Sequence, residues 1–513
     1  NFGADHPYGE IITEASVKSV NLEICRQFIQ TYFSPDRAYL AVIGDITLKE
    51  VKPMVEDYFT KWIKGDPPLH QYKMPKAPSV NTVALVDRMN AVQSNIRVTY
   101  PVRLKLGSKD QVKAKVLNNI LGGGFTGRLF MNLREDKGYT YGAFSTISAD
   151  PVVGYFSAET EVGNAVTDSA ITEILYEMKR LRSEDVDEQI LRETKNYLIG
   201  EFSRSLEDPR TIAMFALNIE RYWMPKNYYK DYLKNIEAVT VQDVKKMAEK
   251  YLMPDNAYIL VVGKGEDVKD KLSRFNPDGK VQFYKPDGSI YDPDAYKAPQ
   301  GISAQKVIDN YIRAIGGRDK LESIQDITIK AQTSFRGNSL TITTLKKAPN
   351  KMVQKQSFGS FESRMVFDGQ KGVQISPGQS TEIVGDQLES LRYEAEMNAI
   401  LRLDQFWIET ELVGEEEIDG RSTYKIKFKP RSGNAWFKYF DKKNNLVVQD
   451  EKYVDTPNGT VAQILIFKDY RPVEGILFPF EMTVRTGDQE LDTQIIFVNI
   501  NKGIEDSEFV IKF

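Results

Sequence analysis

The sequence predicts an α+β protein that contains the end of one α/β sandwich domain, all of a second such domain, and a mainly antiparallel β half-barrel with helices. Three observations support this fold class. "YFSPDRAYLAVIG" at residues 32–44 recurs as "YLMPDNAYILVVG" at residues 251–263. Helical apolar spacing gives way to a continuous apolar run in each copy. Strands of alternating polarity fill the chain after residue 302.

Each copy of the repeat has the same order of elements. An amphipathic helix at residues 16–33 or 239–252 precedes a Pro-Asp turn and a buried strand, and a further helix follows. The second copy extends back to a Pro-rich hinge, whereas the first begins abruptly. By comparison of the two copies we expect roughly 145 further residues of a first domain upstream of Asn1.

The complete copy shows the elements of a sheet covered by helices. Strands are predicted near residues 82–87, 94–100, 139–148 and 154–162, and helices near 109–121, 166–182, 184–202, 209–221 and 241–251. The duplicated ends add strands at 38–44 and 257–263 and helices at 48–59 and 266–275. A short helix is expected to end at Arg134.

Changes of composition place the domain boundaries. Residues 1–65 are expected to be the remainder of a first domain, 66–80 a hinge and 81–274 the second domain. A segment dense in Pro, Gly and Asp at 275–301 is typical of a linker. Residues 302–513 begin with a helix and continue as a curved antiparallel sheet with one more helix near 387–403.

Composition excludes several classes of protein. The net charge is −4 with Lys and Arg dispersed among acids, which gives no basis for a nucleic-acid partner. No apolar run reaches the 18 or so residues of a membrane span. The single cysteine, Cys25, lies at an apolar position of a predicted helix and is expected to be buried.

A glycine-rich loop lies between two predicted helices. "GGGFTG" at residues 122–127 follows a helix instead of a strand, so it does not fit a dinucleotide-binding turn. Its glycines allow close backbone approach, which suits either a peptide-contacting loop or a tight connection.

The only histidines, His6 and His70, are too far apart for an H-x-x-E-H motif or its inversion. We therefore expect no metal site on this chain.

Arg134 and Tyr141 stand out in "LREDKGYTYG". A guanidinium offers a planar fork of donors and a phenol offers a hydroxyl on a rigid ring, so the pair can hold a peptide carbonyl or the oxyanion formed from it. An ordinary Arg–acid pair and a packed Tyr remain the alternative.

"LGGGFTGRLFMNLREDKGYTYG", the "HPYG" near the start and the repeated Y-x-x-P-D-x-A-Y resemble the insulinase/pitrilysin-type zinc metallopeptidases, the inverzincins that include processing peptidases. The resemblance covers about residues 1–275. In that family two homologous domains enclose an extended peptide, and the first carries the zinc site. The resemblance implies that Arg134 and Tyr141 are catalytic residues that bind substrate backbone. It also implies substrate-binding glycines at Gly122, Gly123, Gly124 and Gly127.

The resemblance further implies a zinc cofactor on the missing N-terminal portion or on a separate chain, not on this one. The partners would be that N-terminal fragment or a homologous subunit, together with a peptide substrate. The implied function is the C-terminal part of a zinc metalloendopeptidase. The alternative is a non-catalytic peptide- or lipid-binding envelope protein, or an inactive partner subunit.

Residues 302–513 resemble periplasmic carriers of the outer-membrane lipoprotein sorting type. The resemblance rests on the leading helix, "VFDGQKGVQ", "YFDKKNNLVV" and "FKDYRPVEGILFPFEM". It implies an open half-barrel that receives a lipid or acyl ligand, and a Gram-negative cell envelope location, periplasmic or outer-membrane associated. A structural domain with a filled core is the alternative.

Overall fold

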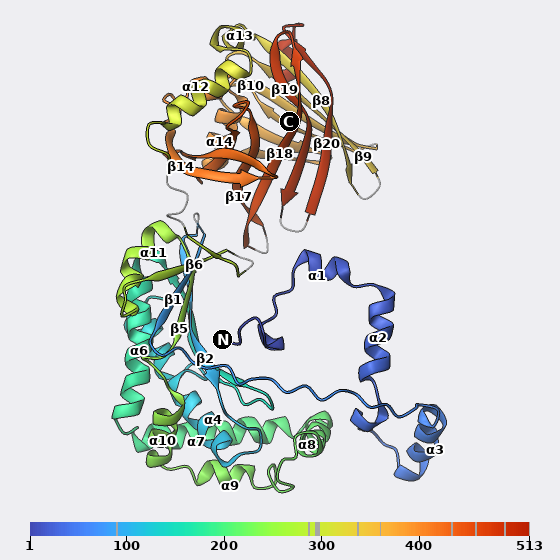
Figure 1. The fold of residues 1–513 in the computed structure, drawn as a ribbon, viewed down its shortest axis with the longest axis vertical. Coiled ribbons are helices and arrows are strands. Elements are labelled where there is room, and N and C mark those ends of the chain that lie inside the picture. The colour runs from blue at the N-terminus through green and yellow to red at the C-terminus, as the bar shows by residue number, and fades with distance from the viewer. Residues whose placement is uncertain are drawn as a thin grey trace. The chain divides into compact units, whose positions relative to one another are not determined.

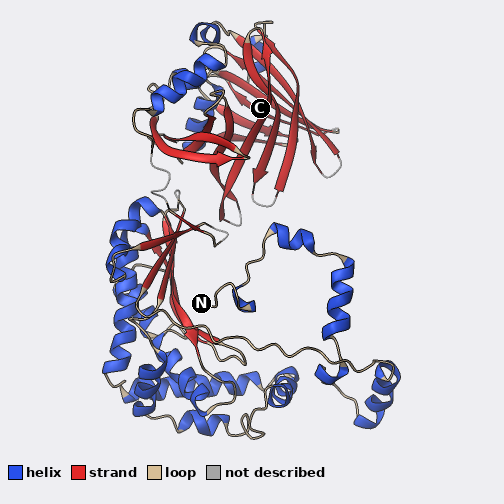
Figure 2. Cartoon of the chain, in the orientation of Figure 1, coloured by secondary structure: helices blue, strands red, loops and turns tan. Residues whose placement is uncertain are grey.

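The computed structural model describes residues 1–511 apart from 89–90, 286–287, 293–297, 336–337, 360, 432–433, 457–458 and 487–488. The chain divides into two compact units, Asn1–Tyr291 and Asp292–Phe513 (Figure 1). Unit 1 combines helices with one sheet, and unit 2 is mostly strand (Figure 2). No helix within the described ranges is both long and apolar enough to cross a membrane.

The sheet of unit 1 has seven strands in the order β3-β4-β2-β5-β1-β6-β7. The strands are β1 (Thr82–Asp87), β2 (Gln93–Val102), β3 (Ala143–Ile147), β4 (Gly154–Gly163), β5 (Tyr258–Gly263), β6 (Val281–Tyr284) and β7 (Ile290–Tyr291). The repeated segment supplies the central strand β5, which pairs in parallel with β1 and antiparallel with β2. Because β6 pairs with β1, part of the predicted linker extends this sheet.

The helices of this part of unit 1 are α4 (Lys109–Leu121), α6 (Thr167–Ser183), α7 (Glu188–Ser205), α8 (Pro209–Arg221), α9 (Tyr232–Glu237), α10 (Val241–Tyr251) and α11 (Gly265–Leu272). Of these, α4, α6 and α11 pack directly on the strands, and α8 lies away from the sheet (Figure 1). α4 packs against α6, α7, α10 and β3, while α6 also packs against β2 and β4. The predicted bounds of α4, α8, α10 and β1 are met to the residue. α7 begins later than predicted because the Asp187 side chain caps it by accepting from two backbone N–H groups.

The N-terminal part of unit 1 contains α1 (Glu14–Ser19), α2 (Leu22–Tyr32) and α3 (Leu48–Phe59), together with the short 3₁₀ turns η1 (Pro7–Gly9) and η2 (Pro35–Arg37). The single helix predicted here is interrupted, because the Asn21 side chain accepts from Ile24 N at 3.0 Å and starts a new helix. The predicted strand at 38–44 is wrong: in the described structure these residues pair with no strand. A strand requires hydrogen-bonding neighbours, and no described strand pairs with this segment.

Cys25 lies on α2 and is exposed, so the prediction that it is buried is also wrong. The apolar face of α2 is solvent-accessible, including Phe28 and Ile29. The amphipathic pattern correctly gave the helix, but within the described residues nothing covers its apolar side.

Unit 2 contains α12 (Ala304–Ala314), α13 (Arg318–Glu322) and α14 (Asp386–Ala395) against a 13-stranded antiparallel sheet (Figure 1). Its strands are β8 (Asp326–Phe335), β9 (Asn338–Lys347), β10 (Lys351–Phe358), β11 (Phe361–Phe367), β12 (Gly372–Ser376), β13 (Gln379–Ile383), β14 (Glu409–Ile418), β15 (Arg421–Lys429), β16 (Trp436–Asp441), β17 (Val447–Thr456), β18 (Gly459–Val473), β19 (Ile476–Thr486) and β20 (Gln489–Ile500). β13 and β14 are the two edges, so the sheet stays open. The predicted fold class, α+β with an antiparallel half-barrel, is confirmed.

The two faces of this sheet are packed by different elements. α12 places Val307, Ile308 and Ile312 in a core with Phe428 and Phe440. The opposite face is covered near the C-terminus by a 3₁₀ helix, η8 (Asp506–Phe509), whose Phe509 ring contacts the core around Leu345 and Val353. The interior of the half-barrel is therefore partly filled by protein side chains.

Candidate functional site

The predicted site residues lie on one continuous segment between α4 and β3. After α4 the chain passes through the glycine-rich loop into a short helix, α5 (Arg128–Phe130), and then a single π-helical turn, η3 (Met131–Asp136). Arg134 lies in this π turn. π turns inside α-helices are rare and occur often at functional sites.

Arg134 and Tyr141 are both on the surface, but they are not joined to each other by a hydrogen bond in the described structure. The Arg134 guanidinium lies 4.8 Å from the centre of the Phe130 ring, and its Nε is 3.5 Å from Glu135. The Tyr141 side chain is 90% exposed, so its hydroxyl is free to meet another molecule.

Tyr141 was predicted on a strand, but it lies two residues before β3. The Thr140 hydroxyl accepts from Gly142 N at 3.1 Å and donates to Gly142 O at 3.0 Å. This small turn delays the strand until Ala143.

Close packing explains three of the four predicted glycines. A Cβ on Gly122 would lie 2.8 Å from Ser145 N, one on Gly123 2.8 Å from Asn119 Cα, and one on Gly127 2.8 Å from Gly122 Cα. Gly124 has open space around it. Packing therefore explains glycine at three positions, as expected if the loop is a tight connection between two helices. Only Gly124 has room for a side chain.

The loop also covers the edge of the sheet. Ser145 N donates to Gly122 O at 2.8 Å, and Asn118 Nδ2 donates to Ser145 O at 3.0 Å. β3 is an edge strand of the sheet. These two hydrogen bonds satisfy the backbone N–H and C=O of Ser145, which point away from β4. A peptide could not pair with β3 at that residue without displacing the loop.

Three phenylalanines form a cluster that the sequence analysis missed. Phe125 from the loop lies 5.2 Å from Phe130 and 5.8 Å from Phe144 between ring centres, and Phe130 and Phe144 are 5.9 Å apart. Phe125 is exposed although it is aromatic. Since Arg134 stacks on Phe130, the cluster joins an apolar surface to a cation. A Phe inside a run of glycines was the one sequence signal for it.

A buried polar network beneath η3 was also missed. Asn132 Nδ2 donates to Glu177 at 2.9 Å and to Glu173 at 3.0 Å. Glu177, on α6, is buried and accepts from Arg180 at 3.2 Å, and Arg128 lies 3.9 Å away. Burial lowers the pKa of Arg128, and the Glu177 carboxylate opposes that shift. The network ties the inner face of η3 to α6.

The histidines do not form a metal site. His6 Nδ1 accepts from Tyr8 N at 3.1 Å, and His70 Nε2 lies 3.1 Å from the Tyr32 hydroxyl. Within the described ranges no three His, Cys, Asp or Glu side chains lie close enough to hold a metal ion. The residues described here therefore do not fit zinc.

A family model matches part of this chain. Residues 19–198 match the Peptidase M16 inactive domain. The sequence resemblance to zinc metallopeptidases is thereby confirmed, and the matched residues include Arg134 and Tyr141. The site described above lies within the matched residues.

Two curated relatives come from Bacillus subtilis. "Uncharacterized zinc protease YmxG" is 24% identical over 254 residues, which cover 49% of this chain and 60% of the relative. "Probable inactive metalloprotease YmfF" is 24% identical over 261 residues, which cover 50% of this chain and 58% of the relative. The chain thus spans about three fifths of the length of these relatives.

Two solved structures illustrate the matches to the chain. A peptidase M16 inactive domain from Pseudomonas fluorescens has a TM-score of 0.46 and 20% identity, covering 51% of this chain and 63% of that one. A LolA superfamily protein, NE2245 from Nitrosomonas europaea, has a TM-score of 0.31 and 12% identity, covering 41% of this chain and 99% of that one.

Proposed function

We propose that unit 1 supplies the substrate-backbone binding part of a zinc-dependent metalloendopeptidase, with the zinc site on an N-terminal portion or on a separate chain. The observation that carries the proposal is the exposure of Arg134 and Tyr141 on a short segment that is anchored from beneath. The M16 match and the name of the relative YmxG support this class of enzyme.

Each residue has a distinct part in this proposal. The Arg134 fork would donate to one or two carbonyl oxygens of an extended peptide, and the Tyr141 hydroxyl would donate to a neighbouring carbonyl. Phe125 would receive an apolar side chain of the substrate, since its ring is exposed and edge-on to Phe130 and Phe144. The Asn132–Glu177 network would keep the backbone at Arg134 in place, which limits the entropy lost on binding.

A non-catalytic role is the second candidate. The matched family model describes an inactive domain, and the relative YmfF is named a probable inactive metalloprotease. In that case the same surface would hold a peptide for a partner subunit or retain it without cleavage. Both candidates predict peptide binding by Arg134 and Tyr141, and they differ in whether zinc and cleavage accompany it.

Peptide binding is tested with fluorescein-labelled β-casein, a disordered polypeptide, by fluorescence anisotropy on the full chain. Arg134→Ala is expected to weaken binding by about tenfold or more, because it removes a charged bidentate donor. Tyr141→Phe removes one hydroxyl and is expected to weaken binding by about threefold to tenfold. Arg210→Ala is the matched control, since Arg210 is an exposed arginine that pairs with the nearby Asp208.

Unchanged casein binding in both site variants would remove these residues from the function. Zinc analysis and intact mass of the natively isolated protein then separate the two candidates. About one zinc in a complex with a second polypeptide that cleaves casein would support the peptidase. Casein binding without zinc or cleavage would support the non-catalytic role.

A further inference from the structure

The turn after α8 contains a tryptophan whose backbone conformation suits a glycine. The helix ends at Arg221, and Trp223 has a φ of +49°. Met224 N donates to Ile219 O at 3.0 Å, which closes a C-terminal turn of the Schellman type. Glycine usually occupies the left-handed position of this turn, because a side chain at positive φ crowds the backbone.

The Trp223 side chain gains no packing in return for this strain. It is 87% exposed, and within the described ranges its ring meets no other aromatic ring and no cation. Met224, the next residue, is buried and lies against Gly107, where an added Cβ would be 2.9 Å from Met224 Cγ. The turn is needed to bring Met224 into the core, but a glycine at position 223 would make the same turn. Folding therefore does not explain the tryptophan.

A second tryptophan in the chain provides a comparison. In the described structure seven non-glycine residues have positive φ, of which five are Asp, Asn or Glu and two are Trp223 and Trp407. A bulky residue in this conformation is an outlier. Trp407 has a contact within the chain, because the Arg431 guanidinium lies 5.8 Å from the centre of its ring. Trp223 has no such contact, so its ring is available to another molecule.

Four exposed cations lie on the segments next to Trp223. They are Arg103, Lys105, Arg221 and Lys226. The first two flank the buried Leu104, and their segment reaches Met224 through Gly107. None of the four forms an ion pair with another described residue. We call Trp223 and these four cations the Trp223 patch.

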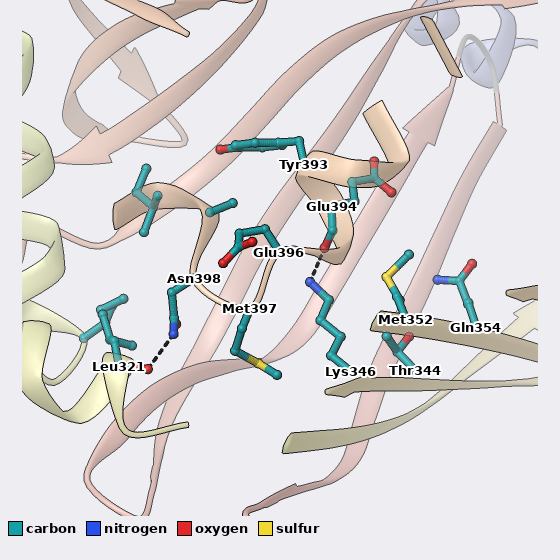
Figure 3. Close-up of a pocket in the computed structure, with 13 residues that line it drawn as sticks. Leu321, Thr344, Lys346, Met352, Gln354, Tyr393, Glu394, Glu396, Met397 and Asn398 are labelled. Atoms are coloured by element: carbon teal, nitrogen blue, oxygen red, sulfur yellow. Dashed lines mark hydrogen bonds between the residues drawn. The ribbon is translucent and has the colours of Figure 1, made fainter. Parts of the chain in front are cut away.

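Other cations in the chain are balanced by the chain itself. Lys250 on α10 lies 2.6 Å from Asp110 on α4. In unit 2, Lys346 Nζ donates to the backbone carbonyl oxygen of Glu394, and the side chains of Glu394 and Glu396 line the same pocket (Figure 3). Unpaired surface cations are common, so the cations of the Trp223 patch become informative only together with the strained, exposed tryptophan.

Acidic side chains border the patch without neutralising it. Asp150 N donates to Leu104 O at 3.3 Å, and the Asp150 carboxylate accepts from the Tyr8 hydroxyl at 3.3 Å. Partial burial and Asp150 raise the pKa of Tyr8, and the Arg221 guanidinium opposes that shift. Glu220 is exposed on α8 directly before Arg221. The patch is thus a small cationic area with carboxylates at its border.

This distribution of charge favours a short acidic segment over an extended anionic surface. The whole chain has a net charge of −4. A bilayer or a nucleic-acid duplex would meet the bordering carboxylates, which act over about 8–10 Å at moderate salt. A short polypeptide segment can place its carboxylates on the cations alone, where charge-assisted hydrogen bonds form. The exposed indole offers a flat apolar surface for one apolar side chain beside them.

We propose that the Trp223 patch docks an acidic segment of another polypeptide. Its carboxylates lie on the four cations, and an apolar side chain packs on the Trp223 ring. The patch is separate from the surface of Arg134 and Tyr141, because Tyr141 lies before the start of β3 and Asp150 lies after its end. The proposal therefore holds whether or not unit 1 serves a peptidase.

The test is fluorescence anisotropy on the full chain with two labelled peptides of equal length. One has three Glu-Phe-Asp-Gly-Ser repeats, and the other has Gln and Asn in place of Glu and Asp. The acidic peptide is expected to bind about tenfold more tightly, because only its side chains are charged. This preference should shrink as the salt concentration rises, because exposed charges are screened.

Variants at the cations test the charge. Lys105→Gln combined with Lys226→Gln should weaken binding of the acidic peptide by about threefold or more, since each exposed pair contributes modestly. Lys306→Gln combined with Lys468→Gln, at two exposed lysines of unit 2, is the matched control and should bind like the parent chain.

Variants at the two tryptophans test the ring. Trp223→Gly should weaken binding by about fivefold or more. It should leave the melting temperature unchanged or higher, because glycine accepts the left-handed conformation. Trp407→Gly makes the same change at the other exposed tryptophan with positive φ and should leave binding unchanged.

Equal affinity for the two peptides on the parent chain would overturn the proposal. So would an acid preference that survives the Lys105 and Lys226 changes, or a lower melting temperature in Trp223→Gly, which would mean that the ring serves folding. Arg134→Ala should keep the acid preference, and its loss there would place the peptide on the other surface. Tighter binding to phosphatidylglycerol vesicles than to the acidic peptide would replace the polypeptide by a membrane. If Trp223→Gly does not fold, the lysine variants decide.

Discussion

The two copies of the repeated segment start from the same pattern and reach different structures. α2 and α10 each have 11 residues and begin after a side-chain cap, Asn21 in the first copy and Thr240 in the second. Both helices are followed by a Pro-Asp turn. Beyond that turn the second copy forms the central strand β5, whereas the first copy remains unpaired.

Burial shows the same contrast. Ile259 and Val261 on β5 are fully buried, while their counterparts Leu40 and Val42 are 59% and 51% exposed. β5 lies between β1 and β2, with α10 packed on α4 and α6. A polypeptide with strands and helices of this kind would give Leu40 and Val42 the neighbours that their counterparts have.

The comparison separates local from non-local causes of structure. A helix makes its hydrogen bonds within itself, so both copies form one wherever the cap and the apolar spacing are present. A strand makes its bonds to other strands, so the same apolar run becomes a strand only where partners exist. Three predictions, in order of expected effect, test this difference.

The largest change in the free energy of unfolding is expected when a buried side chain on the central strand β5 is shortened. Ile259→Ala should lower the free energy of unfolding of unit 1 by about 2–5 kcal/mol, because it leaves a cavity in a closed core. Leu40→Ala, the same kind of change in the exposed copy, should alter it by about 0.5 kcal/mol or less. Urea unfolding of the full chain followed by circular dichroism measures both. Equal losses would mean that the first copy is packed as tightly as the second.

A smaller loss of folding stability is expected when a hydrogen bond at the junction of α10 and β5 is removed. The buried Tyr100 hydroxyl donates to Tyr251 O and accepts from Met253 N, both at 2.9 Å. Burial raises the pKa of Tyr100 well above its usual value, so the group stays protonated. Tyr100→Phe should cost about 1–3 kcal/mol, because two buried backbone groups lose their partner.

Tyr32→Phe is the control for that change. It removes the hydroxyl of the tyrosine that corresponds to Tyr251, in the exposed copy, where Tyr32 lies near His70. Its effect on urea unfolding should lie within about 0.5 kcal/mol. A loss at Tyr32 as large as that at Tyr100 would contradict the comparison.

The smallest effect is expected on the pH dependence of the folding stability of unit 1, through Asp110. Burial alone would raise the pKa of Asp110, but hydrogen bonds from Lys250 Nζ at 2.6 Å and Tyr251 Oη at 2.8 Å lower it below the usual 3.8. The folded state therefore binds this proton less readily than the unfolded state. The resulting stabilisation is present above about pH 4 and is lost as the pH falls through the lowered pKa.

Asp110→Asn should make the stability of unit 1 fall less steeply between pH 5 and about pH 2. The difference should be below about 1 kcal/mol, because Lys250 is largely exposed and solvent screens the pair. Thr31 stands where the first copy would need the lysine, so α2 has no matching contact. An identical pH dependence in the variant and the parent chain would show that the pair contributes nothing to folding.

The candidate site was predicted unevenly. Arg134 and Tyr141 were selected from their side-chain chemistry and the family resemblance, and the structure places both on the surface. The Phe125 cluster and the Asn132–Glu177 network could not be predicted, since each joins residues from elements distant in the sequence or from a loop without periodicity.

By itself the sequence determined the periodicity, the helix caps, the turns and the duplication, because these depend on neighbours a few residues apart. That was enough to predict α4, α10 and β1 to the residue and the open antiparallel sheet of unit 2. The tertiary structure alone decided that one copy of the repeat is a buried strand and the other is not. Strand pairing and burial depend on contacts between residues far apart in the chain. A local sequence pattern therefore does not show whether a neighbouring strand is present.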